Sequence, residues 1–170
     1  MPSGISTGTS TRRGFPPSLF AALPRLLERT GPTEHGSITA IYTILVEGDL
    51  SLDPVAEEVQ AILDGHIILS TELARRNHFP AIDVLGSRSR LMDTVVPPEH
   101  RSDAARIREL LARYAEVELL VRVGEYQRGT DAVVDEAISK IDRIHGFLRQ
   151  ASATRATIAE TQRQIREIVR

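Results

Sequence analysis

The sequence predicts an α/β fold in which part of a parallel sheet is followed by a small all-helical bundle. Two observations lead to this class. Up to about residue 97, short apolar stretches typical of strands alternate with helix-like segments, as in βαβ units. Beyond Pro97 and Pro98, apolar residues recur every three or four positions in three successive segments, which is the spacing of amphipathic helices.

The composition is that of a globular protein and excludes several classes. The 170 residues are 41% hydrophobic and 26% charged, with a net charge of −2. A general nucleic-acid binder would need a basic stripe, which the sequence lacks. There is no cysteine, which fits a reducing compartment, and no stretch approaches the ~20 apolar residues of a membrane span. Residues 1–14 are small and polar and are expected to form a disordered lead-in.

The first predicted elements are a helix and a central strand. Pro17 and Ser18 mark the start of the helix, Gly31 follows its end, and Pro24 should kink it because proline cannot donate the helical hydrogen bond. Residues 37–46 carry apolar side chains on both faces of an extended chain. This pattern favours a strand that is covered on both sides, as in parallel sheets.

A βαβ pattern follows. Asp53 is expected to cap a helix that begins at Pro54 and stops at Gly65. Residues 66–70 then predict a strand, residues 71–77 a short helix, and residues 79–85 a further extended segment, so that we expect these strands to pair in parallel.

Two arginines, Arg88 and Arg90, follow the last extended segment. The residues alone favour a strand that ends in water, and the alternative is an arginine finger, a guanidinium that neutralises charge on a transferred phosphoryl group. The spacing alone leaves both interpretations open.

The second half predicts helices only. The first runs from about 101 to 122 and is followed by a turn over 123–131 with two glycines. Two more helices follow, the last of them from about residue 154. Their predicted apolar positions are Val134, Ile138, Ile141, Ile144, Phe147 and Leu148 in the second helix, and Ile158, Ile165 and Ile168 in the third.

Few chemical motifs are present. The phosphate-binding pattern G-x-x-x-x-G-K-[ST] does not occur, and the single lysine, Lys140, lies in the middle of a predicted helix. There is also no G-x-G-x-x-G. No two histidines stand at the helical spacing of metal ligands, so we predict no metal site; they are His35, His66, His78, His100 and His145.

Four longer strings carry a resemblance that covers about residues 12–150. The sequence resembles the C-terminal portion of the type III secretion export ATPases, which energise flagellar and injectisome secretion and are relatives of the rotary ATP synthase catalytic subunits. The strings are "RRGFPPSLFAALPRLLERTG", "GSITAIYTILVEGD", "AILDGHIILSTELARRNHFPAIDVLGSRSRLM" and "LLARYAEVELLVRVGEYQRGTDAVVDEAI".

The resemblance implies a RecA-like ATPase domain followed by a helical domain. Residues 15–96 would be part of the former, 97–150 the helical C-terminal domain, and 151–170 a C-terminal helix. The family segment S-x-S-R maps onto residues 87–90, so the resemblance makes Arg90 the catalytic arginine finger, acting on the ATP of a neighbouring subunit in a hexameric ring. Arg88 stands where the family usually has a small or apolar residue. Phe79 corresponds to the aromatic residue that packs on the adenine ring.

The resemblance also implies cofactors and partners. They are ATP and Mg²⁺, a homo-hexameric ring, a central stalk protein that meets the turn near 124–131, and chaperone–cargo complexes. The location would be cytoplasmic and peripheral to the inner membrane. Because the family's P-loop is missing from the sequence, we expect a fragment of a protein-secreting ATPase that is inactive alone. The alternative is a non-catalytic helical module that binds stalk or chaperone–cargo partners.

Overall fold

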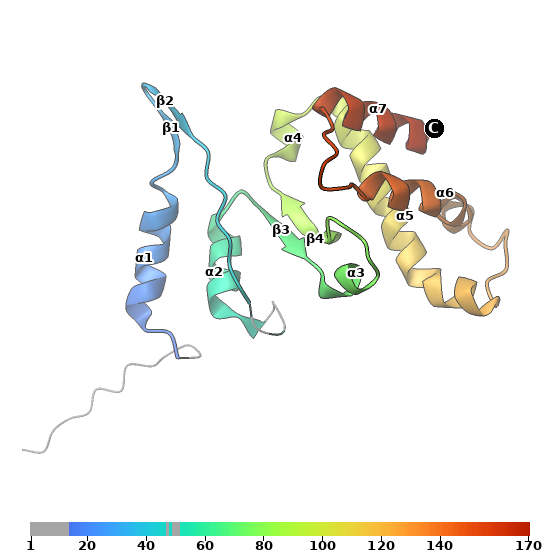
Figure 1. Ribbon diagram of the computed structural model, residues 1–170, viewed down its shortest axis with the longest axis horizontal. Coiled ribbons are helices and arrows are strands. Elements are labelled where there is room, and N and C mark those ends of the chain that lie inside the picture. Colours follow the sequence, from blue (N-terminus) through green and yellow to red (C-terminus); the bar gives the residue numbers. More distant parts are fainter. Residues whose placement is uncertain (1–13, 47, 49–51) are drawn as a thin grey trace, which may run out of the picture. The chain divides into compact units, whose positions relative to one another are not determined.

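The computed structural model describes residues 14–46, 48 and 52–170, which form two compact units, Met1–Asp64 and Gly65–Arg170 (Figure 1). Except for Gly14, the predicted disordered lead-in lies outside the described residues.

The first unit contains two helices and a short hairpin. Its elements are α1 (Pro17–Leu27), β1 (Gly31–Thr33), β2 (Gly36–Ile38) and α2 (Pro54–Ile62). Strands β1 and β2 pair antiparallel, a hairpin that the sequence did not indicate. The predicted cap of α2 is confirmed, because the carboxylate of Asp53 accepts hydrogen bonds from the backbone N–H groups of Val55 and Ala56, each at 2.9 Å.

The predicted central strand over residues 37–46 is wrong. Only Ile38 and its two predecessors belong to a strand, and residues 39–46 have no regular secondary structure. Ile41 and Leu45 are 94% and 91% exposed on one face, and Ile38 is 59% exposed on the other, so the segment is not covered on both sides. A strand forms only against a neighbour that pairs with it. Within the described residues of this unit, no strand pairs with residues 39–46.

In the second unit, two strands pair with each other in the direction opposite to the prediction. Strand β3 (Gly65–Leu69) and strand β4 (Ile82–Ser89) are antiparallel, with helix α3 (Thr71–Arg75) between them. The expected βαβ unit needs a crossover long enough to bring the chain back along the first strand. Helix α3 has only five residues, so the chain turns and runs back beside β3 instead.

The helical second half is confirmed. Its elements are α4 (Met92–Val95), α5 (Pro98–Val123), α6 (Ala132–Leu148) and α7 (Ile158–Val169). Helix α5 ends at Gly124, whose φ of 79° is the left-handed conformation that glycine adopts without strain. Within the part of the chain that the structure describes, no helix is long and apolar enough to cross a membrane.

The core of the second unit lies where α5, α6 and α7 meet, and Figure 1 shows α6 and α7 beside the long helix α5. Its buried members are Ile107, Leu110, Ala137, Ile144, Ile165 and Ile168. Most predicted apolar positions contribute to it or pack against it. Ile158 does not and is 77% exposed, because α7 reaches the core through its later residues Ile165 and Ile168.

Lys140 attaches α7 to α6. Its ammonium donates hydrogen bonds to Glu136 Oε1 at 2.9 Å and to the carbonyl oxygen of Val169 at 2.7 Å. Arg143 adds a bond of 2.8 Å to the carbonyl oxygen of Glu167. Cationic side chains thus satisfy carbonyl groups in the last turn of α7, which have no partner within the helix. The same ammonium lowers the pKa of Glu136, with a smaller contribution from Arg106.

Candidate functional site

The two arginines singled out in the sequence lie at the end of β4. Arg88 is the Cα partner of His66, and Ser89 is the partner of Gly65. Arg90 follows the last residue of the strand, and both arginines are exposed. The end of β4 is therefore held by pairing with the start of β3, and Arg90 lies just beyond this pairing.

The ladder between β3 and β4 is irregular just before these arginines. The partners are His66 with Arg88 and Ile68 with Asp83, so two steps along β3 correspond to five along β4. The three additional residues form a bulge around Gly86.

The bulge has its own hydrogen bonds. The backbone N–H of Gly86 donates to Asp83 Oδ1 at 2.9 Å. The hydroxyl of Ser87 donates to the carbonyl oxygen of Asp83 at 2.5 Å and accepts from the backbone N–H of Ile68 at 2.9 Å. His66 Nε2 lies 3.2 Å from the carbonyl oxygen of Gly86. The irregular segment is thus fixed on both strands.

Gly65 allows the close approach of the two strands. A Cβ atom on Gly65 would lie 2.8 Å from the carbonyl oxygen of Arg88, a backbone atom, which is closer than real contacts allow. Position 65 therefore favours glycine for steric reasons, and it lies directly against the Arg88–Ser89 end of β4. A Cβ atom on Gly86 would meet only the side chain of Asp83 on the same strand this closely, at 2.6 Å from Oδ2.

Arg108 of α5 contacts the same bulge from the helical side. Its guanidinium donates to the carbonyl oxygens of Val84 and Ser87 through Nη1, the latter at 3.3 Å, and to that of Leu85 through Nη2 at 3.1 Å. The role of Arg108 was not predictable from the sequence, because its partners are backbone atoms, which any residue supplies, and no sequence pattern marks the interaction.

Phe79 lies on the turn that precedes β4, and its side chain is 52% exposed. The backbone around it is well held. The carbonyl oxygen of Phe79 accepts a hydrogen bond of 2.9 Å from the N–H of Gln150, and the N–H of Ser70 donates to the carbonyl oxygen of Ala81 at 2.8 Å. An exposed aromatic face on a fixed turn is able to stack on a planar ring.

His78, which precedes Phe79 in the sequence, packs against a second histidine. His78 is buried, and its ring meets the ring of His145 edge-on with centroids 6.1 Å apart. The ring of Tyr114 also meets that of His145 edge-on, with centroids 6.3 Å apart. Burial lowers the pKa of His78, and nearby Arg149 and His145 lower it further. Burial and Arg149 likewise lower the pKa of His145.

The structure does not bring Phe79 and Arg90 together. Phe79 precedes β4 and Arg90 follows it, so the eight residues of the strand separate them. They cannot therefore form one compact pocket within this unit. Within the described residues no group of three or more histidine, aspartate and glutamate side chains is arranged to hold a metal ion.

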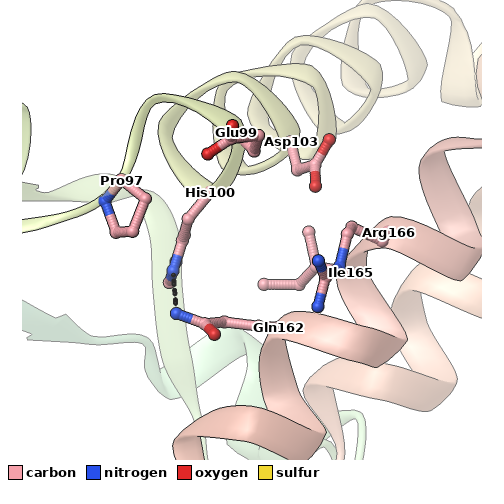
Figure 2. Close-up of a pocket in the computed structure, with 7 residues that line it drawn as sticks. All are labelled: Pro97, Glu99, His100, Asp103, Gln162, Ile165 and Arg166. Carbon is pink, nitrogen blue, oxygen red and sulfur yellow. Dashed lines mark hydrogen bonds between the residues drawn. The ribbon is translucent and has the colours of Figure 1, made fainter.

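A small cavity of about 140 Å³ lies between the start of α5 and helix α7, as Figure 2 shows. His100 and Gln162 face each other across it, with His100 Nδ1 and Gln162 Nε2 2.8 Å apart. Asp103 and Arg166 line another part of its wall. Ligand pockets usually measure ~300–1,000 Å³, so this cavity is too small for a nucleotide. Neither Phe79 nor Arg90 lines it.

Each half of the chain matches a known protein family. Residues 3–89 match the model of the ATP synthase alpha/beta family, nucleotide-binding domain. Residues 96–167 match the model of the T3SS EscN ATPase C-terminal domain. A type 3 secretion system ATPase of Xanthomonas euvesicatoria is 62% identical over 148 residues, which are 86% of this chain and 34% of that protein. The chain thus spans about a third of the length of this curated relative.

Solved structures agree in fold. The assembled ATPase EscN of enteropathogenic Escherichia coli matches with a TM-score of 0.91 and 48% identity, over 97% of this chain and 40% of that one. EscN in complex with its central stalk EscO matches with a TM-score of 0.85 and 46% identity, over 97% of this chain and 39% of that one. With both family models and these structures in agreement, the chain belongs to the ATP synthase alpha/beta family and corresponds to the C-terminal portion of a type III secretion ATPase.

Proposed function

We propose that Arg90 is an arginine finger that acts on ATP bound to a neighbouring subunit of a protein-secreting ATPase ring. The observation that carries the proposal is the place of Arg90, exposed and one residue beyond a strand end held by pairing, bulge and helix contacts. A planar guanidinium can bridge two phosphate oxygens, which an ammonium group cannot do. Arg88 belongs to the paired part of β4, so its position is set by the sheet.

Phe79 is proposed to stack on the adenine ring. Its exposed ring and anchored backbone support this role, since a stacking platform must be accessible and fixed. Its separation from Arg90 also suits the proposal, because the two residues would then serve different nucleotides. ATP and Mg²⁺ would supply the phosphoryl group and the charge that stabilises it. The sequence contains an aromatic ring for adenine, Phe79, and a guanidinium for the phosphates, Arg90, but no lysine-containing phosphate loop.

The proposed setting is the cytoplasmic face of the inner membrane, where a hexameric ring would export secretion substrates delivered by chaperones. The 170-residue chain alone should not hydrolyse ATP, because its one lysine is bonded to Glu136 and Val169 within the bundle. Turnover by the purified chain that disappears in Arg90→Ala would contradict this expectation.

The decisive test is a graft of residues 12–170 onto the P-loop half of EscN. Arginine fingers contribute about 10³-fold or more to the rate of phosphoryl transfer. Arg90→Lys should therefore remove most turnover while nucleotide binding and ring assembly persist. Arg88→Ala is the matched control and should be mild. If Arg88→Ala abolished turnover and Arg90→Lys did not, the finger would be assigned to the wrong residue.

A second function, binding of a stalk or chaperone–cargo partner without catalysis, is favoured by one observation. Apolar side chains are exposed at the end of α5, next to the turn over 124–131: Leu119 is 69% exposed and Val123 is 59% exposed. Substituting both with aspartate should weaken stalk binding without changing the fold of the bundle. Binding of the stalk by a monomeric chain, outside any ring, would favour this module over the ring subunit.

A further inference from the structure

Arg108 is placed to control the strand end that carries Arg90. It lies on α5 between Ile107 and Leu110, which are buried in the helical core. Its guanidinium leaves that core and donates to three carbonyl groups of the bulge in β4. One side chain thus links the packed face of the bundle to the backbone just ahead of the arginines.

These bonds differ from those of the other arginines on α5. Within the described residues, no carboxylate forms an ion pair with Arg108, whereas Arg106 pairs with both Glu109 and Glu136. The charge of Arg108 is directed at main-chain oxygens. Charge-assisted hydrogen bonds are about twice as strong as neutral ones. Three of them on a segment where the ladder is interrupted replace the restraint that regular pairing would give.

The planar shape of the guanidinium matters here. Two of its nitrogen atoms contact carbonyl oxygens on three residues, Val84, Leu85 and Ser87. A lysine has the same charge and three N–H donors, but all three lie on one nitrogen atom, so it lacks the rigid fork with which Nη1 and Nη2 contact these carbonyl groups. The conservative replacement should therefore keep the charge and lose the restraint.

We propose that Arg108 is a positioning residue for Arg90: it holds the bulge of β4 to α5, so that the helical domain sets where the candidate finger lies. This rests on the proposed role of Arg90. A shift of about 1 Å in a catalytic group can cost roughly a hundredfold in rate. Any movement of α5 would reach Arg90 through this contact.

The first test uses the whole 170-residue chain and amide hydrogen exchange. Arg108→Lys should speed exchange of the Gly86 and Ile68 amides, which form the bulge's own hydrogen bonds, by about tenfold or more. Exchange in α6 should stay unchanged. Arg106→Lys is the matched control, since it makes the same change two residues away, where the partners are carboxylates. Unchanged exchange in the bulge, or a uniform increase throughout the unit, would overturn the proposal.

The second test is a double-mutant cycle in the graft onto EscN. Arg108→Lys should lower kcat by about ten- to a hundredfold with little change in KM, and Arg106→Lys should not. In an Arg90→Lys background the effect of Arg108→Lys should disappear, because a residue that acts only through Arg90 has nothing left to position.

The results that would refute the positioning role of Arg108 differ from those that would refute the finger role of Arg90. If Arg90→Lys lowers turnover but Arg108→Lys is neutral, or if the two losses multiply independently, the positioning role is refuted and the finger stands. If Arg90→Lys leaves turnover unchanged, the finger is refuted and its positioning residue with it.

Discussion

The backbone N–H of Gln150 donates a 2.9 Å hydrogen bond to the carbonyl oxygen of Phe79, so the residue that follows the C-cap of α6 holds the turn ahead of β4. These residues are 71 positions apart in sequence, and the bond joins Phe79, the residue proposed to stack on adenine, to the end of helix α6.

Gln150→Pro should destabilise the second unit because it removes the donor of this bond. The loss should be about 1 kcal/mol, the usual net value of one hydrogen bond. Arg149 already has the extended conformation that a residue before proline prefers, at φ −91° and ψ 134°, so the substitution should introduce little strain there. Thermal unfolding is the measurement, with Gln150→Ala as the control that keeps the N–H. Equal melting temperatures for the two variants would show that the bond contributes nothing.

Stability should fall as the pH drops below about 6.5. Burial is the main cause of the lowered pKa values of His78 and His145, and Arg149 adds to it for both. Asp142 and Glu118 oppose the shift for His145, and Arg76 reinforces it. In the unfolded chain the two histidines become protonated near pH 6.5, whereas in the folded chain they become protonated only at a lower pH. Protonation therefore favours the unfolded state. Above that pH the histidines are neutral in both states and the full stability is present; below it, stability falls as the pH approaches the lowered pKa values of the folded chain.

The measurement for this pH dependence is the free energy of unfolding in urea at pH 7.5 and at pH 5.5. His145→Gln should flatten the dependence, since it removes one of the two groups. His35→Gln is the control, because His35 lies on the exposed hairpin of the other unit. A wild-type chain whose stability is the same at both pH values would contradict the expectation.

Gly65→Ala should separate the ends of β3 and β4. The new methyl group would lie 2.8 Å from the carbonyl oxygen of Arg88, a backbone atom that cannot move aside alone. We expect a loss of about 1–3 kcal/mol, typical of overpacking. Gly146→Ala is the matched change: Gly146 lies in α6 with no atom within 4 Å of the new Cβ, and alanine should stabilise the helix there by about 1 kcal/mol. Chemical denaturation of both variants separates steric from helix-propensity effects.

The 170-residue chain should self-associate or bind a hydrophobic dye. Ile41 and Leu45 lie on a segment without regular structure and are almost fully exposed, and contiguous exposed apolar surface favours association. Replacing both with asparagine should reduce dye binding, measured by fluorescence and by analytical ultracentrifugation. Residues 98–170 expressed alone should be soluble and helical. A monomeric full chain that melts in one cooperative step would refute this prediction.

Local features were predictable from the sequence because their causes are local. Asp53 caps α2 with atoms two and three residues away, and Gly124 ends α5 through its own backbone conformation. The helical periodicity likewise identified Ile144, Ile165 and Ile168 as core residues. Each of these depends on a neighbour within one or two helical turns.

Features that depend on distant partners were not predictable. The apolar pattern of residues 37–46 describes what the segment could bury, but not whether another strand lies beside it. The direction of β4 depends on how far α3 extends, which periodicity does not reveal. Arg108 looks like any arginine on a helix, because its partners are main-chain oxygens 21 to 24 residues away.

Lys140 gives the chain an intrinsic chemical reporter. It is the one lysine in the sequence, and its amine is held between Glu136 and the last turn of α7, with 15% of the side chain exposed. A reagent that acylates lysine amines, or an endoproteinase that cleaves after lysine, therefore has a single side-chain target in the whole sequence. That target becomes accessible when α7 leaves the bundle, so the rate of modification measures how often the final helix detaches.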